Sequence, residues 1–385
     1  MNLHEYQSKA RFAEFGIPVL PGKVASTPQQ VYEIARELGD KVVIKAQIPT
    51  PNRAQMGGIL FAENPKQAEN LANSLLGSVI GGLIIRKVLV NPTISIRQEI
   101  YLGMTNDRTT SKPMLIASRE GGRDIIEVAR TSPSLIFRDT INPCIGLRDY
   151  QVRSIASNID LPNEYWKTFL QITYSLYTCF VASDAVLAEI NPLVITTDNR
   201  LLALDSKLII DDNALYRHTD LAEMYDNDGE SDQEARARAA GISYVRLDGQ
   251  IGCMANGAGL AMTTIDMIHR YGDESIGPAN FLDIGGGAQS KTVATALGIM
   301  LADPHVKVVL LNIFGGITRC DEVAGGILRA LDETKANLPL IVRLAGTNAS
   351  EARQMIDSAQ LPNLTSTATL TEAARQAIAS AKGMN

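Results

Sequence analysis

The chain has 385 residues, 45% of them hydrophobic and 20% charged, and its formal net charge is −6. This composition is typical of an ordinary globular protein and excludes a disordered or low-complexity chain. The length predicts two or three folding units, and the negative charge argues against nucleic acid as the main ligand. No apolar run reaches the roughly 18 residues of a membrane span, and the polar, amphipathic first residues do not form a secretory signal.

The cysteines and histidines show no pattern of a metal site. The cysteines are scattered without a CxxC pair, which is typical of reduced thiols in the cytoplasm and predicts no zinc site. The histidines show no HxxxH spacing, so we expect them on the surface or at helix caps. These residues are Cys144, Cys179, Cys253 and Cys320, with His4, His218, His269 and His305.

In chain order, the first elements are amphipathic helices and hairpin-like strand pairs. The helices, 28–39 and 65–77, have apolar residues near helical period and a terminal glycine. A long hairpin over 185–210 turns at Asp198-Asn199, a favourable turn pair. The other predicted strand pairs are 41–48 with 57–63, 87–91 with 98–105, and 113–120 with 121–129.

The pattern changes after residue 224. Residues 224–241 are acidic and polar, so we expect a connector between domains. Beyond it, short apolar strands alternate with helical segments, which predicts a doubly wound parallel sheet. We therefore predict one domain over 1–236 and a second over 237–385.

Glycine-rich turns follow the predicted strands of the second domain. Ligands bind outside the carboxyl ends of such strands, and helix N-termini offer free N–H groups, so these turns predict a pocket for phosphate or carboxylate. The alternative is that short strand-to-helix turns need glycine for their geometry alone. The turns are 256–259, 285–288, 315–318 and 345–348.

Polar side chains interrupt the long apolar hairpin at Glu189, Asn191, Asp205 and Lys207. The predicted turn brings Asn191 nearly opposite Asp205. Amide and carboxylate oxygens suit Mg²⁺, which takes its other ligands from phosphates and water. The alternative is a solvated hairpin face with one cross-strand ion pair. Lys45, alone at the end of an apolar strand, could bind a phosphate or simply reach water.

Several blocks of sequence together resemble a known family. The blocks "MNLHEYQSKA", "EINPLVIT", "GQIGCMANGAGLAM", "ANFLDIGGGA" and "NIFGGITRCDEVA" are similar to the β subunit of succinyl-CoA synthetase, the NDP-forming succinate–CoA ligase. The likeness runs nearly end to end. It implies an N-terminal ATP-grasp domain and a C-terminal flavodoxin-like CoA-ligase domain. It also implies an α partner subunit, in a heterodimer or heterotetramer, that binds CoA and carries a phosphorylated histidine.

The resemblance also implies a reaction. ATP or GTP phosphorylates the α-subunit histidine, the phosphohistidine converts succinate to succinyl phosphate, and CoA then displaces phosphate. In the reverse direction the enzyme makes nucleoside triphosphate from ADP or GDP. By position, the resemblance assigns Lys45 to the nucleotide phosphates, Asn191 and Asp205 to Mg²⁺, Glu189 to the docking place of the phosphohistidine, and Asn256 with Gly316, Ile317 and Thr318 to the dicarboxylate substrate.

The chain departs from the family beside the nucleotide. A loop with a Gly-Arg-Gly core normally covers the phosphates, and here the aligned residues are Asn52, Arg53 and Ala54. Asn91 stands where the family has a glutamate bordering the base, whereas Glu99 is kept. Because lost glycines limit close backbone approach, we expect weakened nucleotide binding.

Alternatives remain open from the residues alone. The β subunit of malate–CoA ligase looks similar over the same blocks, and the sequence does not separate the two acids. A β-like scaffold or regulatory subunit with an impaired nucleotide site is a further hypothesis, supported by the altered loop alone. The nucleotide, ATP or GTP, is equally open. Neither nucleic acid nor a membrane is an expected partner, and the expected location is the cytoplasm.

Overall fold

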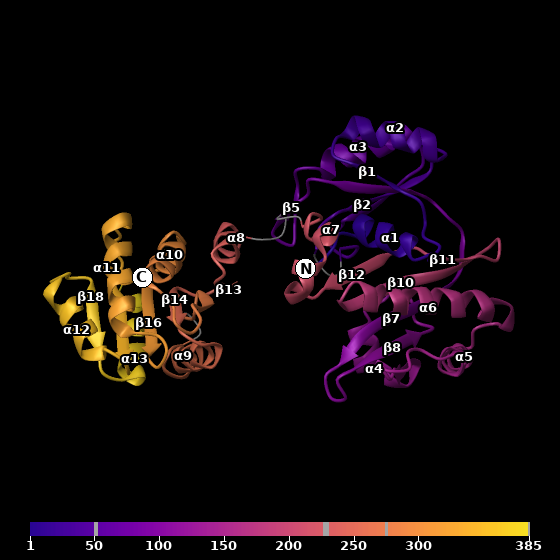
Figure 1. The fold of residues 1–385 in the computed structure, drawn as a ribbon. Helices are drawn as coiled ribbons and strands as arrows, with labels where there is room; N and C mark the ends of the chain where they lie inside the picture. Colours follow the sequence, from indigo (N-terminus) through magenta and orange to yellow (C-terminus); the bar gives the residue numbers. More distant parts are fainter. Residues whose placement is uncertain (50–52, 226–230, 274–275, 384–385) are drawn as a thin grey trace. The chain divides into compact units, whose positions relative to one another are not determined.

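The computed structural model describes residues 1–49, 53–225, 231–273 and 276–383. The chain forms two compact units, Met1–Gly229 and Glu230–Asn385 (Figure 1). The expected connector, 224–241, contains helix α8 (Asp232–Ala239), and the boundary expected after residue 236 lies within this helix. A capping box begins it, because Ser231 Oγ accepts from the Glu234 N–H at 3.2 Å and Glu234 accepts from the Ser231 N–H at 3.0 Å.

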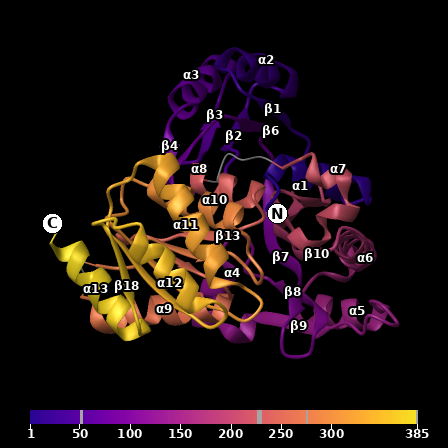
Figure 2. The same ribbon diagram turned by 60° about the vertical axis from the view of Figure 1, so that its left-hand side comes forward.

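The first sheet of the N-terminal unit carries helices on one face. Its strand order is β1 (Lys23–Ala25), β6 (Val88–Pro92), β2 (Val42–Ala46) and β3 (Ile59–Ala62). Helices α2 (Pro28–Leu38) and α3 (Pro65–Leu75) lie together on the side that Figures 1 and 2 show uppermost. Val42, Ile44 and Ala46 point into the core beneath them. The opposite face carries Lys45, which contacts Glu5 of α1 (Glu5–Glu14). Both predicted helices and the predicted pairing of β2 with β3 are confirmed.

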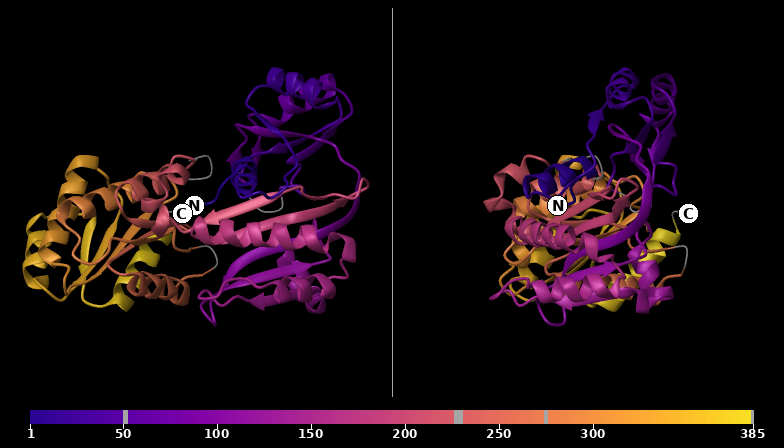
Figure 3. Two further views of the ribbon diagram at one scale, coloured as in Figure 1. Left: turned by 45° about the vertical axis from the view of Figure 1, so that its right-hand side comes forward. Right: turned by 90° about the vertical axis from the view of Figure 1, so that its right-hand side faces the viewer.

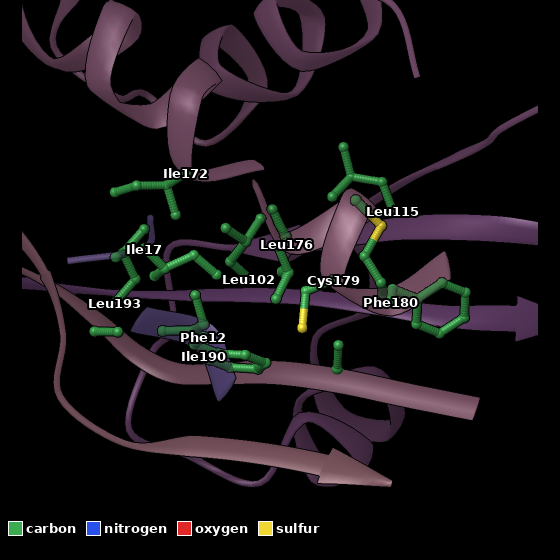
Figure 4. Close-up of a cluster of buried hydrophobic side chains, with 14 of the residues drawn as sticks. Phe12, Ile17, Leu102, Leu115, Ile172, Leu176, Cys179, Phe180, Ile190 and Leu193 are labelled. Carbon is green, nitrogen blue, oxygen red and sulfur yellow. The ribbon is translucent and has the colours of Figure 1, made fainter. Parts of the chain in front are cut away.

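The second sheet of this unit supports the long hairpin. Its order is β11 (Leu201–Ala203), β10 (Ala185–Thr196), β7 (Ile96–Asp107), β8 (Lys112–Ser118) and β9 (Ile136–Thr140), and β12 (Ser206–Ile210) also pairs with β10. Helices α1 (Glu5–Glu14), α5 (Asp149–Asn158) and α6 (Trp166–Ala182) accompany it, with α6 alongside β10 (Figure 3). Phe12, Leu102, Leu176 and Ile190 meet in the core between α1, α6 and the sheet (Figure 4).

Two of the predicted strand pairs are wrong. Residues 87–91 and 98–105 lie in different sheets, because β6 pairs with β1 and β2, while β7 pairs with β8 and β10. Residues 121–129 do not form a strand, since helix α4 (Ile125–Thr131) begins there behind the N-cap Asp124. The predicted turn at Asp198-Asn199 is confirmed, with Asn199 at φ 63° between β10 and β11.

The C-terminal unit is a sheet with helices on both faces. From β14 (Ile251–Ala255), parallel neighbours are β15 (Asn280–Asp283) on one side and β16 (Val308–Phe314), β17 (Leu340–Ala345) and β18 (Leu364–Thr367) on the other; β13 (Ser243–Arg246) joins β15 antiparallel. One face is covered by α9 (Ala258–Tyr271) and α13 (Leu370–Lys382), the other by α10 (Ser290–Leu301), α11 (Cys320–Thr334) and α12 (Ala349–Ser358). The predicted doubly wound parallel sheet is confirmed.

Short elements complete the described chain. They are the hairpin β4 (Val79–Ile80) with β5 (Leu83–Ile84), helix α7 (Thr219–Ala222), and 3-10 turns at Pro133–Leu135, Asn163–Tyr165 and Asp212–Arg217. Among the residues that the structure describes, none of the helices combines the length and apolar character needed to cross a bilayer.

Candidate functional site

Lys45 lies in a buried ion-pair cluster on the face of the first sheet that is turned away from α2 and α3. Side chains alternate along β2, so Lys45 points away from the core beneath α2 and α3. Its Nζ donates to Glu5 Oε1 at 2.7 Å and to the Leu204 carbonyl at 3.2 Å. The side chain is only 7% exposed. The ammonium therefore does not merely reach water, as one interpretation of the sequence allowed.

Arg53 joins the same cluster from the altered loop. Its Nη2 donates to Glu5 Oε2 at 2.5 Å and to Asp205 Oδ2 at 3.0 Å, while its Nη1 donates to the Ala46 carbonyl at 2.9 Å. Lys45 Nζ also lies 3.6 Å from Asp205 Oδ2. The structure thus brings together a predicted phosphate lysine, the loop arginine and a predicted metal ligand.

Sequence reasoning missed the two residues of α1 that complete the cluster. Glu5 and Lys9 form an ion pair of 2.8 Å one helical turn apart, and both are buried. Burial by itself would raise the pKa of Glu5, but Lys45, Lys9 and Arg53 around it bring that pKa well below its ordinary value. Burial lowers the pKa of Lys9. The only signal in the sequence was the i, i+4 spacing, which is more typical of an exposed pair.

Asn191 and Asp205 lie opposite each other, as predicted. The Asn191 N–H donates to the Asp205 carbonyl at 3.3 Å across the hairpin. The Asn191 amide is held by the loop after β8, because its Oδ1 accepts from the Gly122 N–H at 2.8 Å and its Nδ2 donates to the Arg123 carbonyl at 2.9 Å. Nδ2 also lies 3.2 Å from Glu189 Oε1. The carboxylate beside this amide is thus that of Glu189, whereas the contact with Asp205 is made through the backbone.

The donor set fits a hard cation that brings further ligands with it. Asp205 supplies carboxylate oxygens and Asn191 an amide oxygen, the donors that Mg²⁺ prefers. Within the described part of the chain, no group of three or more His, Cys, Asp or Glu side chains could hold a metal by itself. These residues would therefore hold Mg²⁺ only together with phosphate oxygens and water.

Glu189 is a half-buried carboxylate next to this pair. It lies on β10 directly across from Lys207 of β12. Burial raises its pKa above the ordinary value, against the opposing effects of Lys207 and Asn191. Glu189, Asn191, Asp205 and Lys207 are each only partly buried, and Glu189 facing Lys207 is also the cross-strand pair of the alternative interpretation.

Glu99 is covered by a glycine turn that the sequence did not single out. Burial raises the pKa of Glu99, which lies on β7 across from Val194. Gly122 has φ +70°, and a Cβ there would come within 2.4 Å of Glu99 Oε2. The positive φ favours glycine at 122, and Gly121 lies so close to β7 that a Cβ there would come within 2.7 Å of the Glu99 carbonyl carbon. A strand prediction over these residues hid that signal.

The remaining residues predicted to bind the nucleotide are Asn91, Ala54 and Asn52. Asn91 pairs with Val43 in the sheet register, which sets it on the same face as Lys45. It is fully buried, and its Nδ2 donates to the Pro21 carbonyl at 2.8 Å. Its Oδ1 has no hydrogen-bond partner within the described residues. Ala54 is exposed and lies outside the positive-φ region, whereas Asn52 lies outside the described residues.

In the C-terminal unit, the predicted substrate residues meet at the carboxyl ends of β14 and β16. Asn256 Nδ2 donates to the Phe314 carbonyl at 2.9 Å and to Thr318 Oγ1 at 3.1 Å. Thr318 is buried and accepts from the Gly287 N–H at 3.0 Å. Gly316 and Ile317 between these strand ends are exposed. Asn256 directly follows β14, and the next two strands along the chain, β15 and β16, lie on opposite sides of β14. In doubly wound sheets ligands usually bind at such a point.

Two of the N–H groups expected to receive an anion are already engaged. Gly257 and Gly285 both donate to Asp283 Oδ1, at 2.6 and 2.7 Å. The glycine-rich turns at 256–259 and 285–288 are thus tied together by a carboxylate of the chain itself. Sequence reasoning missed Asp283, although it lies only two residues before the glycine run.

The chain is similar to known protein families and relatives over nearly its whole length. The family model of the ATP-grasp domain matches residues 2–195, and that of the CoA-ligase matches residues 254–379. The chain is 50% identical over 384 residues to succinate–CoA ligase [ADP-forming] subunit beta of Roseiflexus sp. (strain RS-1), covering 99% of this chain and 100% of the relative. It is 46% identical over 357 residues to succinate–CoA ligase [GDP-forming] subunit beta of Thermus thermophilus, covering 93% of each.

A solved structure shares the whole fold. ATP citrate lyase from Methanothrix soehngenii, solved with citrate and coenzyme A, superposes with a TM-score of 0.76 at 16% identity, covering 98% of this chain and 99% of that one. At that identity the likeness concerns the fold alone. The predicted fold class, an ATP-grasp domain followed by a CoA-ligase domain, is confirmed.

Proposed function

The chain belongs to the family of succinate–CoA ligase β subunits, and we propose that it provides the nucleotide-binding half of an acid–CoA ligase acting on succinate. Its partner in this proposal is an α subunit that carries CoA and the phosphohistidine. The observation that carries the proposal is the cluster in which Lys45 and Arg53 face Asp205, with Asn191 beside it. Cations beside oxygen ligands are what a magnesium-bound nucleotide requires.

The residues of the N-terminal unit have separable tasks. Lys45 and Arg53 bind the β- and γ-phosphates and offset their charge, with Lys45 acting as a point charge and Arg53 as a planar donor. Asp205 and Asn191 would hold Mg²⁺, which neutralises phosphate charge when bound. Glu189, whose pKa burial raises, lies two residues from Asn191, where it can orient the imidazole that accepts the phosphoryl group.

The residues of the C-terminal unit hold the acid. The Asn256 side chain is engaged within the chain, because its Nδ2 donates to the Phe314 carbonyl and to Thr318 Oγ1 and its Oδ1 accepts from the Phe314 N–H. The donor that this pair offers to an acid is therefore the Thr318 hydroxyl. Gly316 and Ile317, which directly precede Thr318, are exposed, and α11 starts just beyond, at Cys320. A helix N-terminus favours an anion, which suits a carboxylate or a phosphoryl group.

Phosphorylation of the partner tests the nucleotide site. The full chain, co-expressed with its α subunit, is incubated with Mg²⁺ and radiolabelled ATP or GTP, and label on the α-subunit histidine is measured. Asp205→Ala should abolish labelling while circular dichroism stays unchanged. Asp198→Ala, an exposed carboxylate on the same hairpin, is the matched control and should label normally. Normal labelling of the Asp205→Ala complex would remove Asp205 from the proposal.

The finer assignments follow from the same complex. Thioester formation with succinate or malate, each with ATP or GTP, decides the acid and the nucleotide. Heteromer composition follows from the mass of the purified complex. We place the protein in the cytoplasm, where the unpaired state of its cysteines is the norm.

A further inference from the structure

Both oxygens of Asp205 are engaged by the chain itself. Oδ1 accepts from the Ser206 N–H at 2.8 Å, and Oδ2 receives Arg53 Nη2 at 3.0 Å. Lys45 Nζ lies 3.6 Å from the same Oδ2. The oxygen that a metal would need is therefore faced by two cationic groups.

Arg53 is held firmly in this position. Its guanidinium also contacts Glu5 Oε2 at 2.5 Å and the Ala46 carbonyl at 2.9 Å. Burial alone would lower the pKa of Arg53, but Asp205 and Glu5 raise it above its ordinary value, so the group stays charged. Because the guanidinium is planar, the contacts with Glu5 and Ala46 fix where its remaining donor points. Glu5 is thus the positioning residue that keeps Arg53 against Asp205.

The charges of the cluster oppose a metal arriving alone. Lys45 Nζ and Arg53 Nη2 lie 3.6 and 3.0 Å from Asp205 Oδ2, and both side chains are largely shielded from water. A divalent cation that arrives alone at this oxygen would be repelled by both groups, and the repulsion is poorly screened there. Nucleotide phosphates reverse the balance, because they bring negative charge that attracts Arg53 and Lys45.

We propose that Arg53, positioned by Glu5, competes with the divalent metal for Asp205, so that the metal binds with the nucleotide and not before it. Phosphates draw Arg53 away and release Asp205 Oδ2 at the moment when the metal needs it. This inference rests on the proposed nucleotide site, and it assigns to the altered loop a role in the order of binding.

Removal of the guanidinium should have opposite effects on the two ligands. In Arg53→Gln, the metal alone should bind about tenfold more tightly or better, because a charge-assisted contact to Asp205 no longer has to be broken. The same variant should bind ADP more weakly, because a phosphate contact is lost. A merely structural role of Arg53 would weaken both.

Titration with Mn²⁺ measures this directly. The free ion is followed by electron paramagnetic resonance with the full chain, first without nucleotide and then with ADP. The matched control is Arg200→Gln, which removes one positive charge from an exposed ion pair with Asp198 on the same hairpin and should leave both affinities unchanged. Arg53→Lys keeps the charge and should gain less affinity for Mn²⁺ alone than Arg53→Gln. Thermal unfolding checks that each variant is folded.

Clear outcomes overturn the inference. It fails if Arg53→Gln binds Mn²⁺ alone no better than wild type, or if Arg53→Lys gains as much as Arg53→Gln. It also fails if wild type binds Mn²⁺ as tightly without ADP as with it, a comparison that holds even where Arg53→Gln does not fold. If wild type binds no ADP, the proposed function fails instead, while the comparison of variants with Mn²⁺ alone still decides the competition.

Discussion

Replacing Glu5 by glutamine tests whether the buried cluster holds the N-terminal unit together. Glu5 is the carboxylate that Lys9, Lys45 and Arg53 share, at 2.8, 2.7 and 2.5 Å. Its side chain is 2% exposed, so water cannot solvate the cationic groups that would lose their partner. Glutamine keeps the shape, removes the charge and turns one acceptor oxygen into an N–H₂ donor. The variant therefore tests the negative charge together with its two acceptor oxygens.

The expected loss is large for a single isosteric change. Removing one member of a buried ion pair typically costs about 3–5 kcal/mol, because its partners are left uncompensated. Asp205 still faces Arg53 and Lys45, which offsets part of that loss. We therefore expect Glu5→Gln to lower the free energy of unfolding by about 3 kcal/mol. Glu14→Gln, on the same helix and in an exposed pair with Arg11, should cost less than about 1 kcal/mol.

Urea unfolding followed by fluorescence measures the difference. Trp166, the only tryptophan of the sequence, lies on α6 and reports the N-terminal unit. The pKa of Glu5 is depressed in the folded chain, so its stabilisation is complete above the ordinary value of 4.5 and is lost as pH falls below it. The difference in the free energy of unfolding between wild type and Glu5→Gln should therefore become smaller at acid pH. A loss no larger than that of Glu14→Gln at neutral pH would refute the reasoning.

Two further predictions concern the site. Burial raises the pKa of Glu189, so folding favours its protonated form. The contribution of Glu189 to stability therefore falls as pH rises from the ordinary pKa of 4.5 through the higher pKa of the folded chain. This fall should be absent in Glu189→Gln, and urea midpoints of the variant that change with pH in parallel with those of wild type would contradict the prediction. Ala54 lies outside the positive-φ region, so Ala54→Gly should not tighten Mg²⁺–ADP binding and should cost about 0.4–1 kcal/mol of stability. A calorimetric titration that finds several-fold tighter binding would show that the bound loop needs a left-handed residue there.

The parts of the site that sequence could predict are those set by local geometry. The opposition of Asn191 and Asp205 could be predicted because side chains alternate along a strand and because the turn at Asp198-Asn199 fixes the hairpin register. The parallel sheet was found because strands and helices alternate over short distances along the chain. In both cases the deciding interactions lie close together in sequence.

The parts that sequence missed depend on distant segments. Strands β6 and β7 are consecutive along the chain, yet they pair in different sheets, because their partners are β1, β2, β8 and β10. Glu5 and Lys9 have the spacing of an exposed helical pair, and only the neighbouring Lys45 and Asp205 make them a buried cluster. Asp283 was overlooked because its role, tying together two turns, needs both turns in space.

In the loop that departs from the family, the glycines that shape the turn follow Arg53, at Gly57 and Gly58. The Gly58 N–H donates to the Arg53 carbonyl at 2.9 Å, and a Cβ at Gly58 would come within 2.7 Å of Arg53 Cγ. Gly57, at φ +80°, donates to the Ala54 carbonyl at 3.2 Å and completes the turn. These glycines allow the chain to fold back so that Arg53 reaches Glu5 and Asp205. Here these glycines therefore serve to place the guanidinium of Arg53, the residue of the Gly-Arg-Gly core that this chain keeps.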